Sequence, residues 1–296
     1  MKYDVIIIGG GIAGVTAAIY LKRANKNVIL IESSSIGGQI INASEVENYP
    51  GYVSIKGYEL AKVFKEQLNN LSIDVKYESV TKIDGIDDNF TITTNNGVYN
   101  SKKIIIATGT VSRKLSIGDK FNGRGISYCA TCDGNFFKGK DVAVLGGGNT
   151  AIDDALYLSN ICNKVYLIHR NSNFKAEESK VALLKEKENV ELVTDAILVN
   201  INGENEIESV EVTQGDNNRV INVKGIFVCI GRINSINFID GLDNTNGFIN
   251  TNDELETNIK GIYAIGDVRN KEVRQLTTAA ADGTIVSSII IKNFKK

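Results

Sequence analysis

The sequence predicts an α/β fold, because one arrangement of apolar runs and glycine turns occurs twice in the chain of 296 residues. In the first copy, residues 5–8 form a short apolar run that leads into a glycine-rich turn. A helix-like stretch follows to about Lys22, and a second apolar run, residues 28–31, ends at Glu32. Short apolar runs bounded by turn residues indicate buried strands. The order is therefore strand, turn, helix, strand.

The second copy repeats this order and its spacing. Residues 142–145 lead into another glycine turn and a helix, and the strand that follows ends at His169. Eighteen positions separate Gly14 from Glu32, and eighteen separate Ala151 from His169. Two Gly-x-Gly-x-x-small turns, each between a strand and a helix, predict two Rossmann-like dinucleotide-binding domains. The predicted fold class is therefore α/β, with sheet and helix in three layers.

The residue types in the two turns suit a bound pyrophosphate. The first glycine permits the tight turn, the second lets the backbone approach the pyrophosphate, and the third, small residue lets the helix pack on the strand. The pyrophosphate then faces unpaired N–H groups at the helix N-terminus. The first turn supplies the candidate contacts Gly9, Gly11, Ile12, Ala13 and Gly14. The second supplies Gly146, Gly148, Asn149, Thr150 and Ala151.

The residue that ends the second strand of each copy predicts which dinucleotide it takes. Glu32 would accept a hydrogen bond from a free ribose 2′-hydroxyl and repel a 2′-phosphate. The second copy has His169 and Arg170 at that place, with Lys175 a few residues further on. Cations there suit a 2′-phosphate. We therefore predict FAD in the first domain and NADPH in the second.

The composition excludes several other classes of protein. The net charge is −2, and no cluster of Lys and Arg indicates a nucleic-acid partner. No apolar run reaches the roughly 20 residues that cross a membrane, and the N-terminal run is no signal peptide. With one histidine, His169, and one close cysteine pair, no metal site is expected. The expected location is the reducing cytoplasm.

Cys129 and Cys132 form a Cys-x-x-Cys sequence, which in a protein with nucleotide-binding units is typical of a redox pair. The short loop would hold both sulfurs close enough to cycle between disulfide and dithiol. The attacking species must be a thiolate, and Asp133, directly after the pair, could exchange protons with it. The other two cysteines, Cys162 and Cys229, lie in apolar surroundings and are expected to be buried fillers.

Several motifs together resemble the low-molecular-weight thioredoxin reductases over essentially the whole chain. The most specific is the string Cys-Ala-Thr-Cys-Asp-Gly at residues 129–134, just before the second glycine turn. The related lipoamide-type reductases keep their cysteine pair in the FAD domain, where this chain has no cysteine. The other residues that carry the resemblance are Gly37, Gly38 and Gln39, residues 47–51, Ala107, Thr108 and Gly109, residues 266–269, and Arg274 and Gln275.

The resemblance implies roles for individual residues. Cys132 would face the flavin, Cys129 would attack the disulfide of thioredoxin, and Asp133 would accept and donate the proton. Asp267 would bind the ribitol–phosphate portion of FAD. The other FAD contacts that the resemblance implies are Gly37, Gly38, Gln39, Asn48, Ala107, Thr108, Gly109, Gly266, Arg274 and Gln275.

The resemblance also implies a homodimer in which the NADPH domain is inserted into the FAD domain. We place the FAD domain at residues 1–111 and 238–296, and the NADPH domain at residues 112–237. The cysteine pair and the nicotinamide site then belong to the same domain, yet both must reach the same flavin. Rotation of one domain against the other between the two half-reactions is therefore expected.

The phosphate-binding string departs from the pattern of these reductases, which is His-Arg-Arg-x-x-x-Arg. Asn171 replaces one arginine and Lys175 replaces another. A hydrogen bond to a charged group is worth about 1.5–3 kcal/mol, so losing one would weaken NADPH binding roughly ten- to a hundredfold. Lys175 keeps the charge but not the two-pronged geometry of arginine. We expect a preference for NADPH that is weaker than usual, with some use of NADH.

Three other interpretations stay open at this stage. The electron donor could be ferredoxin instead of a nicotinamide, although the intact second glycine turn speaks against it. The acceptor could be a glutaredoxin-like protein or a protein of a peroxiredoxin system. The chain could also be a flavin-binding redox sensor whose cysteine pair signals without turnover.

Overall fold

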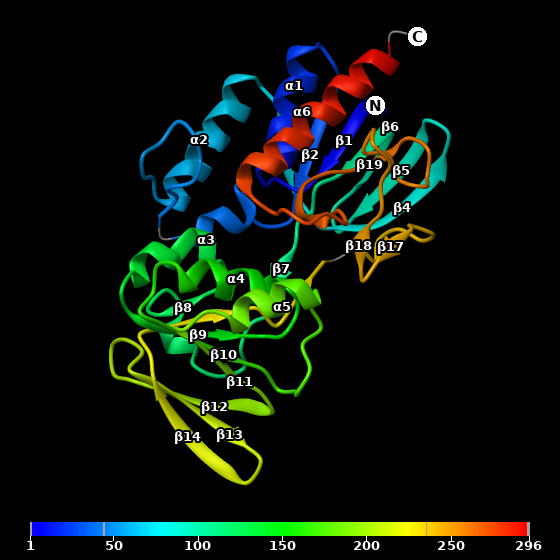
Figure 1. Ribbon diagram of the computed structural model, residues 1–296. Coiled ribbons are helices and arrows are strands. Elements are labelled where there is room, and N and C mark those ends of the chain that lie inside the picture. Colours follow the sequence, from blue (N-terminus) through cyan, green and yellow to red (C-terminus); the bar gives the residue numbers. More distant parts are fainter. Residues whose placement is uncertain (1, 44, 235, 295–296) are drawn as a thin grey trace. The chain divides into compact units, whose positions relative to one another are not determined.

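The computed structural model describes residues 2–43, 45–234 and 236–294 (Figure 1). The chain forms two compact units: unit 1 is Met1–Val111 with Ile233–Lys296, and unit 2 is Ser112–Arg232. The second division falls five residues before the expected position 237. Ile236 explains this difference, because its side chain packs against the core of unit 1.

Unit 1 is built on a seven-stranded sheet in the order β3-β2-β1-β6-β5-β4, with β19 also paired to β6. The strands β1, β2, β3, β6 and β19 run parallel, and β4, β5 and β6 form an antiparallel meander. Their bounds are β1 Lys2–Ile8, β2 Val28–Glu32, β3 Asp74–Tyr77, β4 Val80–Ile86, β5 Asn89–Thr94, β6 Val98–Ile106 and β19 Ile262–Ala264.

Both faces of this sheet are covered, as the continuous apolar runs predict for parallel strands. Successive residues of a strand point to opposite faces. Val5 and Ile7 of β1 therefore pack in the core beneath α1 (Ile12–Arg23), α2 (Gly57–Asn70) and α6 (Leu276–Asn293). Ile6 and Ile8 pack in a second core on the other face. Figure 1 shows α1 and α6 side by side over β1 and β2.

The α1–α6 contact brings the end of the chain onto the first glycine turn. A Cβ on Gly283 of α6 would lie 2.5 Å from the carbonyl oxygen of Ala13, so only glycine allows this approach. Ser287 of α6 donates a hydrogen bond to the Ala17 carbonyl at 3.2 Å. Helix α6 thus packs directly against α1, the helix that follows the first glycine turn.

Unit 2 has a five-stranded parallel sheet in the order β11-β10-β9-β15-β8. One face carries α3 (Ala130–Asp133), α4 (Asn149–Ser159) and α5 (Glu178–Lys185), and the other packs on a three-stranded antiparallel sheet, β12-β13-β14. The strand bounds are β8 Ile126–Ser127, β9 Asp141–Leu145, β10 Lys164–Ile168, β11 Val190–Val193, β12 Ala196–Asn202, β13 Ser209–Gln214, β14 Asn217–Asn222 and β15 Gly225–Val228.

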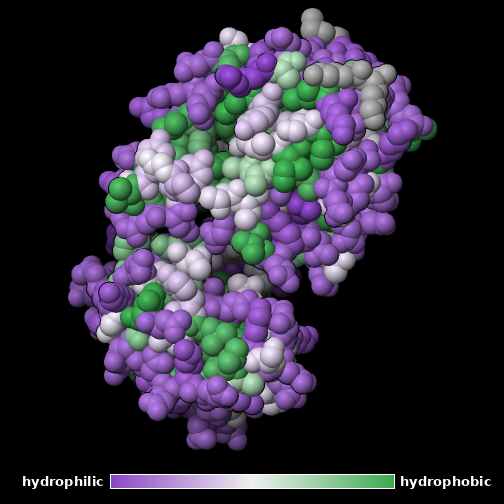
Figure 2. Space-filling model, turned by 45° about the horizontal axis from the view of Figure 1, so that its top comes forward, coloured by the Kyte–Doolittle hydropathy of each residue, from purple (hydrophilic) through white to green (hydrophobic). Residues whose placement is uncertain are grey.

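Short elements complete the two units. The 3₁₀ turns are η1 Gly38–Asn42, η2 Asp119–Phe121, η3 Gly134–Phe137 and η4 Gly266–Val268. The two-stranded pairs are β7 Val111–Ser112 with β16 Arg232–Ile233, and β17 Asn244–Thr245 with β18 Phe248–Ile249. The visible surface of each unit is mostly hydrophilic with separate apolar spots, which is ordinary for a folded chain (Figure 2). Among the helices of the described residues, none is both long and apolar enough to span a membrane.

Candidate redox and dinucleotide sites

The redox pair lies at the start of α3 in unit 2. Cys129 and Cys132 are joined by a disulfide, with their Cα atoms 5.3 Å apart. The N–H groups of Cys132 and Asp133 both donate to the Cys129 carbonyl, at 3.2 and 3.1 Å. One helical turn therefore brings two cysteines three positions apart onto the same side. Both side chains are partly exposed, so the disulfide is accessible to a reactant.

Asp133 is held by Ser127, a residue that the sequence analysis did not single out. Ser127 is buried at the end of β8, and its hydroxyl donates to Asp133 Oδ2 at 2.6 Å. Burial raises the pKa of Asp133, and the bond from Ser127 lowers it; the net shift is upward. An acid whose pKa lies above its ordinary value is better suited to both release and accept a proton near neutral pH.

The first glycine turn has the geometry that a pyrophosphate requires. Gly9 has φ +111°, and a Cβ there would collide with the carbonyl oxygen of Ala107. A Cβ on Gly14 would collide with the Gly9 carbonyl, so the helix can approach the strand only because this position is glycine. A Cβ on Gly11, in contrast, would meet no atom within 4 Å. The backbone at Gly11 therefore borders open space, which fits a bound phosphate.

The carboxylate of Glu32 is hydrogen-bonded to the backbone of this turn. Its Oε2 accepts a hydrogen bond from the Gly10 N–H at 2.6 Å, and its Oε1 accepts one from the Ser34 N–H at 2.7 Å. Each carboxylate oxygen has a further lone pair for a ribose hydroxyl. The Gly37 N–H donates to the Gly10 carbonyl at 2.8 Å. Glu32 and Gly37 are therefore both hydrogen-bonded to Gly10 of the first glycine turn.

The other residues expected at FAD come together from distant parts of unit 1. Asn48 Nδ2 donates to Gln275 Oε1 at 3.3 Å across 227 positions of the sequence. The Arg274 guanidinium donates to the Asp267 carbonyl at 3.4 Å and lies 4.2 Å from the Phe248 ring centroid. Residues near Gly9 and Gly11 include Gly38, Ile12, Ala13, Ala107, Thr108 and Gly266. Gln39 is exposed in η1, and Gly109 has φ +63° after β6.

Thr108 supplies a direct indication that this region accommodates a polar group. Its hydroxyl oxygen is buried and has no hydrogen-bond partner within the described residues. A buried hydroxyl that stays unpaired is unfavourable, and such groups in proteins nearly always have a partner. Together with the open space at Gly11, this atom fits a bound FAD whose polar atoms would complete the pairing.

The second glycine turn repeats the first in unit 2. Gly146 has φ +152°, and a Cβ there would collide with the Cys229 carbonyl. The nearest atom to a Cβ on Gly148 would be the Lys175 carbonyl oxygen at 3.9 Å, so this backbone also borders open space. Ala151 is fully buried beneath the turn, whereas Thr150 is exposed in the first turn of α4. These features fit the pyrophosphate of a second dinucleotide.

In the segment that follows β10, some of the residues expected to bind NADPH make contacts within the protein. His169 is only 8% exposed, donates a hydrogen bond from Nε2 to the Asn173 carbonyl (3.2 Å) and stacks on the Phe174 ring with centroids 5.3 Å apart. A Cβ on Gly147 would collide with its imidazole. The histidine therefore packs against the turn, and the exposed cations of this segment are Arg170 and Lys175.

Asn149, the first residue of α4, holds this segment against the helix through hydrogen bonds to Glu177. Its Oδ1 accepts a hydrogen bond from the Glu177 N–H at 2.9 Å, and its Nδ2 donates to Glu177 Oε1 at 3.4 Å. The Lys175 N–H donates to the Gly147 carbonyl at 2.7 Å. The residues that would face the 2′-phosphate are thus held beside the glycine turn.

Comparison with known proteins agrees with this geometry. Residues 3–283 match the family described as pyridine nucleotide-disulphide oxidoreductase. The chain belongs to this family. It is 41% identical over 290 residues to the thioredoxin reductase of Mycoplasma genitalium, covering 95% of this chain and 92% of the relative. It is 39% identical over 292 residues to that of Treponema pallidum, covering 96% and 95%.

The structures agree as well. The crystal structure of thioredoxin reductase from Streptococcus pyogenes has 35% identity to the chain and a TM-score of 0.92, covering 99% of this chain and 98% of that one. The resemblance drawn from the motifs is confirmed: by full-length homology the chain is a thioredoxin reductase, with a redox Cys-x-x-Cys pair at Cys129 and Cys132.

The reductase holds the turn η4, Gly266–Val268, with a buried acid that sequence reasoning missed. Asp282 in α6 is 7% exposed, and its Oδ2 accepts a hydrogen bond from the Gly266 N–H at 2.8 Å. Its Oδ1 lies 3.1 Å from the Arg269 guanidinium, and its Oδ2 lies 3.0 Å from the Lys271 ammonium. The signal in the sequence was an acid in the middle of an otherwise apolar helix.

One expectation about the remaining cysteines was wrong. Cys162 is buried as expected, and burial raises the pKa of its thiol to about 11. Cys229, in contrast, is only partly buried, and its thiol donates to Asp154 Oδ2 at 3.1 Å. It directly follows β15, so it lies at the carboxyl edge of the sheet beside Gly146 and not within the apolar core.

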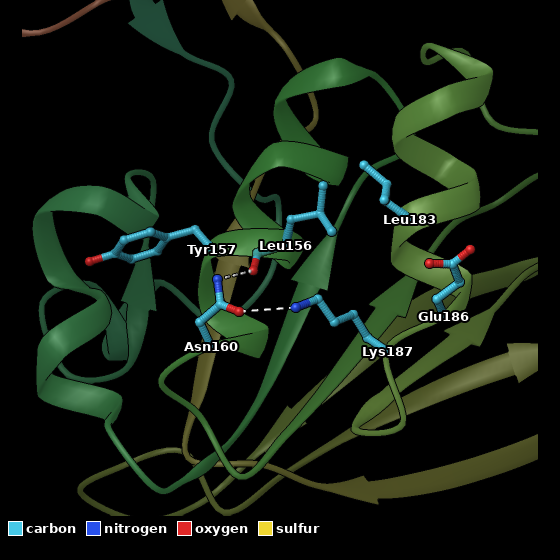
Figure 3. Close-up of a pocket in the computed structure, with 6 residues that line it drawn as sticks. All are labelled: Leu156, Tyr157, Asn160, Leu183, Glu186 and Lys187. Carbon is cyan, nitrogen blue, oxygen red and sulfur yellow. Dashed lines mark hydrogen bonds between the residues drawn. The ribbon is translucent and has the colours of Figure 1, made fainter.

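A shallow groove on unit 2 lies apart from the glycine turn. It is formed by α4 and the α5 region and lined by Leu156, Tyr157, Asn160, Leu183, Glu186 and Lys187 (Figure 3). Lys187 donates to Asn160 Oδ1 at 3.1 Å across it. The groove borders the C-terminal half of α4, whereas a pyrophosphate needs the N-terminus of the helix. It is therefore no part of the dinucleotide site.

Proposed function

We propose that the chain transfers two electrons from NADPH, through FAD, to the Cys129–Cys132 disulfide and then to the disulfide of thioredoxin. The observation that carries the proposal is a disulfide-bonded Cys-x-x-Cys pair beside a partly buried, hydrogen-bonded acid, in the unit that also contains the second glycine turn. The names of the full-length relatives point to the same acceptor.

FAD would be held by unit 1. The support is the open backbone at Gly11, the unpaired hydroxyl of Thr108, and Glu32, whose carboxylate favours a free ribose hydroxyl. FAD would supply the chemistry of hydride acceptance and two-electron release. NADPH would be held by unit 2, since Gly148 borders open space and Arg170 and Lys175 are exposed where its 2′-phosphate would lie.

The protein residues act chiefly at the disulfide. When two electrons reach the Cys132 sulfur, the S–S bond breaks and the Cys129 sulfur leaves as a thiolate. Protonated Asp133 gives its proton to that thiolate, which leaves Cys129 as a thiol and Cys132 as a thiolate. The partly buried position of Asp133 and its raised pKa suit this donation.

The second half-reaction reverses the direction of the proton. Ionised Asp133 takes the proton of the Cys129 thiol, and the thiolate attacks one sulfur of oxidised thioredoxin. The thioredoxin S–S bond breaks, and the leaving sulfur takes the proton back from Asp133. The Cys132 thiolate then attacks the Cys129 sulfur, which restores the enzyme disulfide, and the second thioredoxin sulfur leaves as a thiolate that takes a proton from solvent.

We also propose that the enzyme is a cytoplasmic homodimer in which the two domains rotate between the half-reactions. The support is that the redox pair and the second glycine turn share unit 2, so they would have to approach one flavin in turn. Light scattering of the purified holoenzyme would give its oligomeric state.

The decisive experiment is an anaerobic titration of the purified flavoprotein. NADPH should bleach the flavin, and oxidised thioredoxin should restore its colour. Cys132→Ser should still bleach but should not support continuous NADPH oxidation with thioredoxin. Bleaching by reduced ferredoxin and not by NADPH would overturn the donor, and turnover that persists in Cys132→Ser would overturn the electron path.

A further inference from the structure

The hydroxyl of Ser127 lies at the centre of the redox segment. Ser127 is the last residue of β8 and is 4% exposed. Its Oγ lies 2.6 Å from Asp133 Oδ2, 3.1 Å from the Cys129 nitrogen and 3.3 Å from the Cys129 carbonyl oxygen. One buried hydroxyl therefore contacts both the candidate proton carrier and the backbone of the attacking cysteine.

The number of hydrogens on this hydroxyl limits what it can do. A serine hydroxyl has one hydrogen to donate and two lone pairs that accept. The Cys129 N–H occupies one lone pair. The Asp133 carboxylate and the Cys129 carbonyl then compete for the single hydrogen. While Asp133 is ionised the carboxylate wins, because bonds to charged acceptors are shorter and roughly twice as strong as neutral ones.

Protonation of Asp133 changes this arrangement without moving a heavy atom. The new O–H of Asp133 can donate to the second lone pair of Ser127 across the same 2.6 Å. The serine hydrogen is then released and can turn to the Cys129 carbonyl at 3.3 Å. Every group has a partner in both states, as buried polar groups require.

We propose that Ser127 is a positioning residue with two hydrogen-bond states, which couples the protonation of Asp133 to the backbone that carries Cys129. In the first state it holds the Asp133 carboxylate ready to take the Cys129 proton. In the second it accepts from the protonated acid and donates to the carbonyl of Cys129. This rests on the proposed exchange between the enzyme dithiol and thioredoxin.

Among the described residues near Asp133, Ser127 is the one that can couple to the protonation of its carboxylate. The neighbouring helix α4 contributes Asp153, which pairs with Lys180, and Asp154, which accepts from the Cys229 thiol. The Tyr157 ring of α4 lies against Gly134. The adjoining turn η3, Gly134–Phe137, contains no titratable side chain. Among these neighbours, only Ser127 acts on the pKa of Asp133 through a hydrogen bond.

The test is the pH dependence of kcat/KM for thioredoxin in the holoenzyme with Ser127→Ala. This ratio reports the free reduced enzyme, in which Asp133 must be ionised to act as a base. The lost bond stabilises the ionised form, so its removal raises the pKa of Asp133. Because the protonated state loses its weaker bond as well, the acidic limb of the profile should move to higher pH by about one unit.

Three further variants separate this role from a structural one. Ser127→Thr keeps the hydroxyl and should restore the wild-type limb. Ser159→Ala removes another buried serine of unit 2, which donates to the Leu156 carbonyl at 2.8 Å, and should leave the limb in place. In an Asp133→Asn background, adding Ser127→Ala should produce no further pH shift, because the coupled group is gone.

The outcomes are distinguishable. If the wild-type enzyme does not reduce thioredoxin with NADPH, the proposed function fails. If the wild type is active but Ser127→Ala has the same acidic limb, the coupling is wrong. It is equally wrong if Ser127→Ala lowers the rate by the same factor at every pH, or if it shifts the profile in the Asp133→Asn background.

Discussion

Removing the charge of Asp282 tests whether this acid holds the turn that carries Asp267. In Asp282→Asn, the cations of Arg269 and Lys271 lose their shared partner while their side chains remain only 16% and 14% exposed. Taking one partner from a buried ion pair typically costs about 3–5 kcal/mol. A domain of this size loses about 2–4 °C of melting temperature per kcal/mol, so unit 1 should melt about 6–20 °C lower.

Scanning calorimetry of the holoenzyme measures this change, and release of flavin fluorescence on heating reports the FAD turn separately. The matched control is Asp84→Asn in the same unit, whose pair with Lys82 at 2.9 Å is exposed. Exposed pairs contribute about 0–1 kcal/mol, so this variant should melt close to the wild type. If Asp282→Asn melts as Asp84→Asn does, the buried network does not stabilise the turn and the reasoning is refuted.

Three other predictions follow from the dinucleotide segment and the buried thiol. Gly148→Val should raise the KM for NADPH about ten- to a hundredfold, which is the equivalent of one lost bond to a charged group. Stability should change little, because the added Cβ meets open space. An unchanged KM would contradict the phosphate assignment. Asn171→Arg combined with Lys175→Arg should raise the ratio of kcat/KM for NADPH over NADH about tenfold or more, and no rise would show that these positions do not face the 2′-phosphate. Cys162, whose pKa is raised to about 11 by burial, should resist iodoacetamide at pH 8 in the folded enzyme and react after unfolding, as peptide mass spectrometry would show.

Local patterns in the sequence were sufficient to predict the framework of both units. The apolar runs at residues 5–8 and 142–145 are strands, and the stretches after each glycine turn are helices, because each of these depends on contacts between near neighbours. The first helix ends at Arg23, one residue beyond the expected Lys22. The resemblance to thioredoxin reductases depended on strings such as residues 129–134, which are contiguous and therefore visible without a fold.

Sequence patterns failed where a position depends on a distant contact. The two compact units divide five residues before the expected position 237, because nothing local shows that Ile236 packs against the core of unit 1. That His169 lies at the ribose stays a prediction, but no local pattern shows that its ring packs against Gly147 and Phe174. Cys229 follows an apolar run yet lies at the sheet edge against Asp154.

The sequence by itself determined the fold class, the redox pair and the two glycine turns, because each is specified by residues close together in the chain. Only the tertiary structure decided which polar side chains support them. Ser127, buried at the end of β8, contacts Asp133 across a chain reversal, and Asp282 reaches Gly266 from the facing helix. Such partners are chosen by the packing of separate elements, and hydrogen bonds between them leave no periodic trace in the sequence.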